Sequence, residues 1–351
     1  THMLDKVYQT IQENNLISPG DRVIVALSGG PDSVCLGYIL WRLREKLGIK
    51  IILAHLNHNL RGEEAEKDAK FVKKFAADLS LPLECKKLIN KPTNENAGRA
   101  MRYKFLKQTA KKYRAAKIVV AHHQDDQAET ILLHFLRGAG LSGLSGMRYQ
   151  NGKIIRPLLD CPRLEILSYL EKNNLSYRVD QSNFSLKFTR NKIRLKLLPL
   201  LEKEYNPQIR KNLLHLSKIC RASQEYIAEE ARALFLEHPS FLLLKTWRAL
   251  PAILKREVLR QMIAAGSGDC RDIYASHLEE AVKMLETQAG NKKKNLPRDL
   301  QIIKKNGKIW VKKLINPELR NANSLAFLSF PRKRESRNSA KIQPGSPPTR
   351  G

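Results

Sequence analysis

The feature that most constrains the fold is a run of β-forming residues that stops at a glycine-rich turn and continues as a helix-forming segment. The run covers 22–27, the turn SGGPDS covers 28–33, and the helix is expected to begin at Pro31. Proline suits a first helical turn because its missing N–H would have no partner there. Strand, glycine turn and helix together favour an anion, since free backbone N–H groups and the helix dipole converge on it. The segment therefore predicts phosphate binding.

The order of strand and helix repeats through the first part of the chain. Apolar, β-forming segments are expected to form strands at 22–27, 50–57, 81–89, 116–123 and 153–159. Helix-forming segments follow the first four of them. This alternation indicates an α/β fold with a doubly wound parallel sheet of Rossmann-like organisation. Ligands of such sheets bind at the carboxyl ends of the strands, where SGGPDS and the segment HHQDDQAET both lie.

The character of the chain changes near residue 190, so we expect more than one domain. Residues 1–205 are expected to form the catalytic domain and 206–315 a mostly helical second domain. Within the latter, 300–313 is typical of a β-hairpin because Asn306-Gly307 suits its turn. Residues 316–351 are rich in Ser, Pro, Arg and Asn and lack periodicity, which predicts a disordered tail.

Charge and cysteine content bound the partners and the compartment. The formal net charge is +29, from 63 Lys and Arg against 34 Asp and Glu, which favours a nucleic-acid partner over a merely basic surface. The five cysteines are scattered and form no CxxC pair, which argues against a zinc ribbon or an iron–sulfur ligand set and favours a reducing, cytoplasmic setting. No apolar run reaches the roughly 20 residues needed to span a bilayer, so no membrane partner is expected.

The segment HHQDDQAET carries the strongest candidates for acid–base or metal chemistry. Asp126 and Glu129 are i, i+3 neighbours on one helix face, beside His122 and His123 at the strand exit. Paired carboxylates there can hold Mg²⁺, orient a substrate ammonium or act as a base. Acidic residues also suit any helix N-terminus, so a purely structural role is the alternative. A metal hydrolase is a further reading, but it would leave the phosphate turn unexplained.

The turn itself is not a Walker A loop, because its lysine is absent. Ser28 and Ser33 offer hydroxyl groups, and Asp32 is a candidate magnesium ligand. In a structural reading, Asp32 and Ser33 would only cap the helix. We expect the whole turn to bind ATP phosphates, through Ser28, Gly29, Gly30, Pro31, Asp32 and Ser33.

Two basic groups are candidate RNA contacts. Arg190, Asn191 and Arg194 in FTRNKIR stand near the change of domain, although a charged helix start would look the same. The run Lys292, Lys293 and Lys294 lies near further lysines, with Asp299 as the acidic counterweight between 291 and 313. Such runs are often solvated surface, but here a tRNA footprint is favoured.

The SGGPDS turn resembles the PP-loop of the N-type ATP pyrophosphatases, which cleave ATP between its α and β phosphates. Further segments resemble the bacterial tRNA(Ile)-lysidine synthetase family, in that family's order and over about residues 20–205. They are HLNHNLRGEEAEKDAKFV, AGRAMRYKFL, AHHQDDQAETILLHFLRGAGLSGLSGM, IIRPLLDCPRLEI and FTRNKIRLKLLPLLE. The second domain is similar only in character and position, and we expect no counterpart of the second C-terminal domain of longer members.

This resemblance implies an enzyme that uses ATP to adenylate C2 of the wobble cytidine in the CAU anticodon of tRNA(Ile). Free L-lysine then displaces AMP and gives lysidine, which changes the identity of the tRNA from Met to Ile. Mg²⁺ is then expected at Asp32 and Asp126. His55 and His58 flank the exit of the second strand, where an adenine can lie, although either fits a structural histidine equally well. The resemblance implies catalytic roles for Asp32, Arg102, His122, Asp126 and Glu129.

Two other readings stay open. The chain could be another ATP pyrophosphatase, such as a tRNA thiolase, although thiolases with an iron–sulfur cluster need cysteine pairs that this sequence lacks. It could instead be an RNA-binding protein with an inactive nucleotide fold, which the presence of Asp32, Asp126 and Glu129 argues against. The sequence leaves open whether the chain is a monomer or a homodimer.

Overall fold

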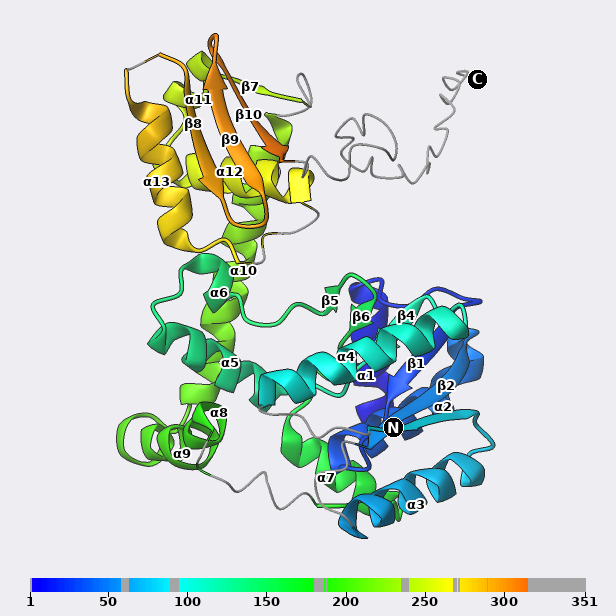
Figure 1. Ribbon diagram of the computed structural model, residues 1–351. Helices are drawn as coiled ribbons and strands as arrows, with labels where there is room; N and C mark the ends of the chain where they lie inside the picture. Colours follow the sequence, from blue (N-terminus) through cyan, green and yellow to red (C-terminus); the bar gives the residue numbers. More distant parts are fainter. Residues whose placement is uncertain are drawn as a thin grey trace, which may run out of the picture. The chain divides into compact units, whose positions relative to one another are not determined.

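The computed structural model describes residues 2–57, 63–88, 95–179, 186, 188–234, 240–267, 270, 272–288 and 290–314. His58 and the tail 316–351 lie outside these ranges. The chain forms two compact units, Thr1–Gln224 and Glu225–Gly351, which are described separately (Figure 1). The division into 1–205, 206–315 and 316–351 stays a prediction.

The first unit contains a six-stranded sheet in the order β3-β2-β1-β4-β6-β5. Its strands are β1 (Arg22–Ala26), β2 (Lys50–Asn57), β3 (Leu83–Lys87), β4 (Lys117–Val119), β5 (Gln150–Asn151) and β6 (Ile154–Ile155). The pairs along β3-β2-β1-β4-β6 are parallel, and β5 adds an antiparallel edge. The predicted doubly wound sheet is therefore confirmed. Its order reverses between β1 and β4, which is where such sheets open a ligand crevice.

Helices cover both faces of this sheet because β1 is apolar on both sides. Val23 and Val25 pack into one core with α1 (His2–Glu13), α2 (Pro31–Leu47), α3 (Glu63–Asp78) and α7 (Arg163–Lys172). Ile24 faces the other way, into a core shared with α4 (Glu95–Lys112). Alternate residues of a strand point to opposite faces, so a continuous apolar run is what a doubly covered strand requires.

Beyond the sheet, α5 (Gln124–Leu136) is followed by the short α6 (Leu141–Leu144). Later in the chain a compact helical segment packs against α5. It consists of α8 (Thr189–Lys192), a π-helical turn at Ile193–Leu197, α9 (Leu198–Leu200) and a second π-helical turn at Leu201–Tyr205. Ile193, Leu198 and Leu213 form one core cluster with Ile131 of α5. This packing brings the FTRNKIR segment against the HHQDDQAET helix. The helix α10 (Ile209–Ala233) follows.

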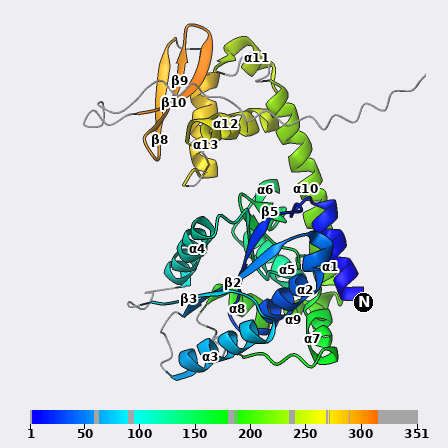
Figure 2. The ribbon, with the colours of Figure 1, turned by 90° about the vertical axis from the view of Figure 1, so that its right-hand side faces the viewer.

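The second unit combines helices with a four-stranded antiparallel sheet in the order β7-β10-β9-β8. Its elements are β7 (Leu242–Leu243), α11 (Leu244–Ala249), α12 (Ala252–Ser267), α13 (Ala275–Glu286), β8 (Lys292–Leu296), β9 (Leu300–Lys305) and β10 (Lys308–Lys313). The hairpin at 300–313 is confirmed, and Asn306 and Gly307 both have positive φ, at 51° and 72°. Figure 2 shows the sheet on one side of this unit, with α12 and α13 on the other.

The sequence did not predict the strands β7 and β8. The run that contains Lys292, Lys293 and Lys294 was expected as a tRNA footprint and not as a strand, yet it pairs with β9 along its whole length as β8. Pairing with an apolar neighbour thus overrides the low β-propensity of lysine. In the described part of the chain, no helix is both long enough and apolar enough to cross a membrane.

Candidate active site at the switch point of the parallel sheet

The SGGPDS turn joins β1 to α2 in a conformation that its own residues hold. Gly29 has a φ of +91°, which side chains rarely adopt, and its carbonyl accepts a 2.9 Å hydrogen bond from the backbone N–H of Arg178. Ser33 Oγ accepts from Ser28 N at 3.1 Å and donates to the Gly30 carbonyl at 2.9 Å. The two hydroxyl oxygens lie 3.0 Å apart. These serines therefore shape the turn.

The N-terminus of α2 is open to an anion. Its N-cap is Gly30, and no side chain of the described residues caps it, so the reading in which Asp32 and Ser33 only cap the helix is not what the structure shows. Pro31 occupies the first turn, as predicted. The free N–H groups of an uncapped helix start need acceptors, and a phosphate supplies them.

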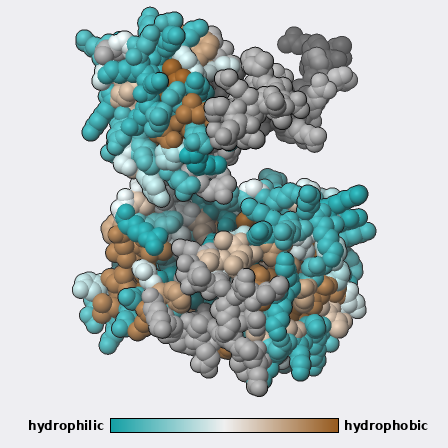
Figure 3. All heavy atoms as spheres, viewed as in Figure 1, coloured by the Kyte–Doolittle hydropathy of each residue, from teal (hydrophilic) through white to brown (hydrophobic). Residues whose placement is uncertain are grey.

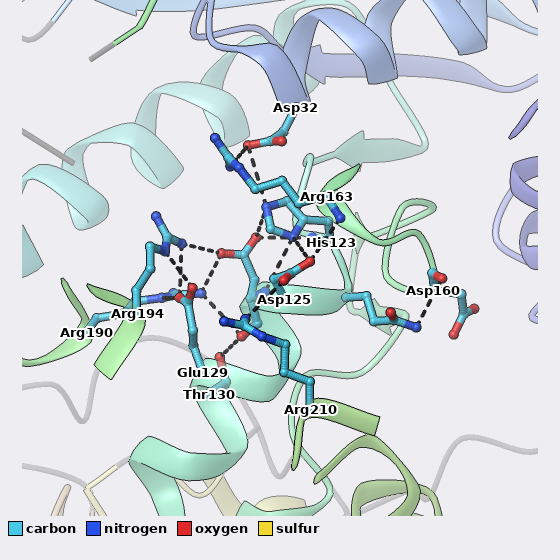
Figure 4. Close-up of polar contacts among 12 residues, drawn as sticks. Asp32, His123, Asp125, Glu129, Thr130, Asp160, Arg163, Arg190, Arg194 and Arg210 are labelled. Carbon is cyan, nitrogen blue, oxygen red and sulfur yellow. Dashed lines mark hydrogen bonds and ion pairs between the residues drawn. The ribbon is translucent and has the colours of Figure 1, made fainter. Parts of the chain in front are cut away.

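Asp32, at the start of α2, points toward His123 and Arg163 (Figure 4). Its Oδ2 lies 3.3 Å from Arg163 Nη1 and 3.6 Å from His123 Nε2. Its Oδ1 is buried and has no hydrogen-bond partner among the described residues. Burial raises the pKa of Asp32, although His123 and Arg163 oppose the rise. A buried, unpaired carboxylate oxygen is costly, so Oδ1 suits a ligand that the protein alone does not supply, and a hard cation such as Mg²⁺ fits it.

Figure 4 shows Glu129 beside Arg190 and Arg194, which come from α8 and from the following π-helical turn. Asp126 pairs with the same two arginines. Asp126 Oδ1 lies 2.9 Å from Arg190 Nη2 and 3.0 Å from Arg194 Nη2. Glu129 Oε2 lies 2.9 Å from Arg190 Nε, and its Oε1 lies 2.5 Å from Arg194 Nε. Both carboxylates are buried. Two acids and two guanidinium groups thus form one network, which we call the carboxylate–arginine cluster.

The electrostatics of this cluster keep Asp126 ionised. Burial alone would raise the pKa of Asp126, but the neighbouring His123 and Arg190 outweigh it and hold this pKa well below its usual range. Its Oδ2 also accepts from the backbone N–H of His123 at 3.1 Å. Protein donors therefore occupy both oxygens of Asp126. Asp32, with its unpaired Oδ1, is the better fit for a metal ligand.

The adjacent histidines differ in their surroundings. His123 is buried, and its Nδ1 accepts from Asp126 N at 3.4 Å. Its Nε2 lies 3.6 Å from Asp32 Oδ2 and 3.5 Å from Asp126 Oδ2, so this ring links the turn to the carboxylate–arginine cluster. His122, for which a catalytic role was predicted, accepts instead from Arg156 Nε at 3.2 Å. Burial lowers the pKa of His122 to about 3, so the ring is neutral near pH 7.

The remaining predicted residues lie at different distances from this centre. His55 hydrogen-bonds the Leu27 carbonyl through Nδ1 at 2.8 Å, and its buried Nε2 has no partner in the described structure, which suits an adenine contact. Arg102 lies on α4 with its guanidinium 5.8 Å from the Tyr103 ring centroid. Asn191 lies on α8 between the two arginines. Lys292, Lys293 and Lys294 belong to the second unit.

Sequence reasoning missed two arginines that complete the site. Arg163, at the start of α7, pairs with Asp32. Arg210, on α10, lies 3.0 Å from Asp125 Oδ1 and 2.6 Å from Glu202 Oε1. Arg163 stands in the segment IIRPLLDCPRLEI, whose resemblance to a family could have marked it. Arg210 carries no such signal.

Comparison with known proteins places this arrangement in a family. A sequence profile of the PP-loop domain matches residues 1–201. A tRNA(Ile)-lysidine synthase from Clostridioides difficile is 36% identical over 334 residues, which cover 90% of this chain and 72% of that relative. One from Caldanaerobacter subterraneus is 34% identical over 324 residues, covering 89% of this chain and 69% of that relative.

A solved structure adds a likeness of fold. It is the U34-tRNA thiolase NcsA from Methanococcus maripaludis with its 4Fe-4S cluster, which matches with a TM-score of 0.51 at 18% identity. The match covers 62% of this chain and 78% of that one. The strand order, the phosphate turn and the sequence matches agree. The chain belongs to the PP-loop proteins and, among them, to the tRNA(Ile)-lysidine synthase family.

Proposed function

We propose that this protein is an ATP-dependent ligase that joins L-lysine to C2 of the wobble cytidine of tRNA(Ile) with a CAU anticodon. The observation that carries the proposal is the position of two buried carboxylates, Asp126 and Glu129, beside Asp32 and the phosphate turn. His123 Nε2 reaches both Asp32 and Asp126 at 3.6 and 3.5 Å, so the turn and the carboxylates belong to one centre. We also infer a cytoplasmic location, where ATP, lysine and tRNA are all available.

In the first step, the C2 oxygen of cytidine attacks the α phosphorus of ATP and pyrophosphate leaves. The open N-terminus of α2 and the turn residues would bind the phosphates. Mg²⁺, held by Asp32, would supply positive charge to the leaving pyrophosphate. The buried His55 Nε2 at the end of β2 would face the adenine. Arg163 would keep Asp32 oriented.

In the second step, the ε-amine of lysine attacks C2, the C2–O bond breaks and AMP leaves. The attacking amine must be neutral, so lysine has to lose a proton as it binds or reacts. Asp126 and Glu129 would position the amine, and one of them would accept a proton. Because the pKa of Asp126 is low, Asp126 suits charge stabilisation better than proton transfer.

Lysine can reach the carboxylates only if the two arginines give up some of their contacts. Arg190 and Arg194 satisfy both carboxylates, so an ammonium group must share or displace these contacts. An anion nearby, such as the adenylate phosphate or the tRNA backbone, would attract the guanidinium groups away from the acids. Arg190 and Arg194 would then pair with Asp126 and Glu129 in the protein alone and bind RNA phosphates in the complex.

The test is incorporation of radiolabelled lysine into tRNA. We expect label in tRNA only when ATP is present and the anticodon is CAU, with AMP released in equal amount. Sulfur transfer without lysine incorporation would favour a thiolase, and tRNA binding without ATP cleavage would favour an inactive RNA-binding protein. The thiolase alternative is disfavoured because three of the five cysteines, Cys35, Cys161 and Cys220, are buried.

A further inference from the structure

One face of the second unit's sheet is apolar and packed, while the other carries a different set of residues. Ile302 and Leu300 of β9, with Ile309 and Val311 of β10, are buried in the core that includes α12. Side chains alternate along a strand, so Ile303, Trp310 and their row neighbours point to the opposite face. The register places Trp310 opposite Ile303, and Ile303 opposite Lys293. Trp310 and Ile303 are only half-buried.

Lysines flank this apolar row on the same face. Lys308 is opposite Lys305 on one side of the row, and Lys312 is opposite Gln301 on the other. Lys293, Lys305, Lys308 and Lys312 are all exposed. We call this set the tryptophan face; its members are Trp310, Ile303, Lys293, Lys305, Lys308 and Lys312. Figure 3 shows hydrophilic residues around a small hydrophobic patch over these strands.

Two contacts support this assignment of sides. Gln301 Nε2 donates to Asn295 Oδ1 at 2.7 Å, and the register puts these two residues opposite each other on the tryptophan face. By contrast, Lys294 is turned to the other side, where its Nζ pairs with Glu280 of α13. Of the predicted run Lys292, Lys293 and Lys294, only Lys293 therefore belongs to the tryptophan face.

The chemistry of the face selects its occupant. A half-buried aromatic ring flanked by exposed lysines offers stacking to a base and positive charge to the phosphates on either side. A second copy of the chain is disfavoured, because the four lysines of one face would oppose the four of the other. One of these cations, Lys308, already lies over an aromatic ring, with its Nζ 4.2 Å from the ring centroid of Phe241.

We propose that the tryptophan face binds RNA, with an unpaired base stacked on Trp310 and neighbouring phosphates held by Lys305, Lys308 and Lys312. The identity of that RNA as tRNA rests on the proposed function. The stacking itself does not, because any unpaired nucleotide offers the same π-face.

The test compares Trp310→Leu with Trp310→Tyr in filter binding to tRNA and to a duplex RNA without unpaired bases. We expect Trp310→Leu to weaken tRNA binding about tenfold, since loss of one base–aromatic stack has that order of effect. Trp310→Tyr should retain most of the affinity, and duplex binding should change little in either variant. Lys283→Gln on α13 is the matched charge control, because Lys283 is exposed outside the sheet.

Equal tRNA affinity in Trp310→Leu and the parent protein would overturn the proposal, as would an equal loss for tRNA and duplex. A change in sedimentation behaviour with unchanged RNA affinity would assign the face to self-association instead. Circular dichroism of Trp310→Tyr provides the folding check if Trp310→Leu is unstable. Failure of the proposed function shows differently: the parent protein would bind RNA through this face yet incorporate no lysine.

Discussion

The two units use positive charge in opposite ways. Arg190 and Arg194 of the first unit are part-buried and pair with buried acids at 2.5 to 3.0 Å. Lys305 and Lys308 of the second unit are exposed on a sheet that has few acids. A buried ion pair fixes the positions of its side chains and is little affected by salt. Exposed charges attract a polyanion over a longer distance, and salt screens that attraction. The first kind suits chemistry, and the second suits holding a polyanion.

The largest effect should come from a substitution in the buried site of the first unit. We expect Asp32→Ala to slow ATP-dependent pyrophosphate release by about a hundredfold or more, because it removes the carboxylate of the phosphate turn that would hold Mg²⁺. The melting temperature should change little, since Asp32 is not part of an apolar core. Pyrophosphate release at close to the parent rate would show that Asp32 does not act on the phosphates.

A second effect should appear in stability against pH. His122 has a pKa of about 3 in the folded protein against an ordinary 6.5, so the unfolded chain binds a proton that the folded chain does not. The neutral His122 ring therefore costs no stability above pH 6.5. The free energy of unfolding declines as the pH falls from 6.5 toward 3, because the unfolded chain gains a proton that the folded chain does not bind. The slope should be no more than about 1.4 kcal/mol per pH unit.

His122→Gln is the matched variant for that effect, because Gln can still accept the hydrogen bond from Arg156 Nε but does not titrate. Urea unfolding at pH 7, 6 and 5 should give a shallower loss of stability in this variant than in the parent protein. Parallel losses in the two proteins would mean that His122 is not the group that titrates.

The smallest effect should separate two lysines that are adjacent in sequence. Lys293→Gln should lower the salt dependence of tRNA binding by about one slope unit, because Lys293 lies on the tryptophan face. Lys294→Gln should change it less, since the Lys294 ammonium already pairs with Glu280. Plots of log affinity against log salt measure both. The comparison fails if the two substitutions have the same slope.

Local patterns were enough to predict the sheet and the phosphate turn. The apolar run of β1, the glycine that takes a positive φ and the proline of α2 are all signals within a dozen residues. The hairpin of the second unit was predictable for the same reason, through Asn306-Gly307. The strand β8 was not, because only its pairing with β9 distinguishes it from a surface charge run.

Most residues of the candidate site could be proposed from the sequence, but their pairwise contacts could not. Arg190 and Glu129 are 61 residues apart, and only the packing of α8 against α5 brings them together. No sequence pattern shows that an arginine expected to face RNA also pairs with a carboxylate for which a catalytic role is proposed. His122 and His123 are likewise equivalent by spacing, and the helix start decides which ring lies between Asp32 and Asp126.

We propose that the carboxylate–arginine cluster receives lysine after ATP has adenylated the tRNA. Trapping adenylated tRNA with Glu129→Gln, first without lysine and then with increasing lysine, tests it most directly. We predict normal formation of the adenylated tRNA, a higher lysine requirement and slower AMP release, with tRNA affinity nearly unchanged. Failure already at adenylation would assign Glu129 to the phosphate step, and normal adenylation with normal lysine dependence would contradict the account.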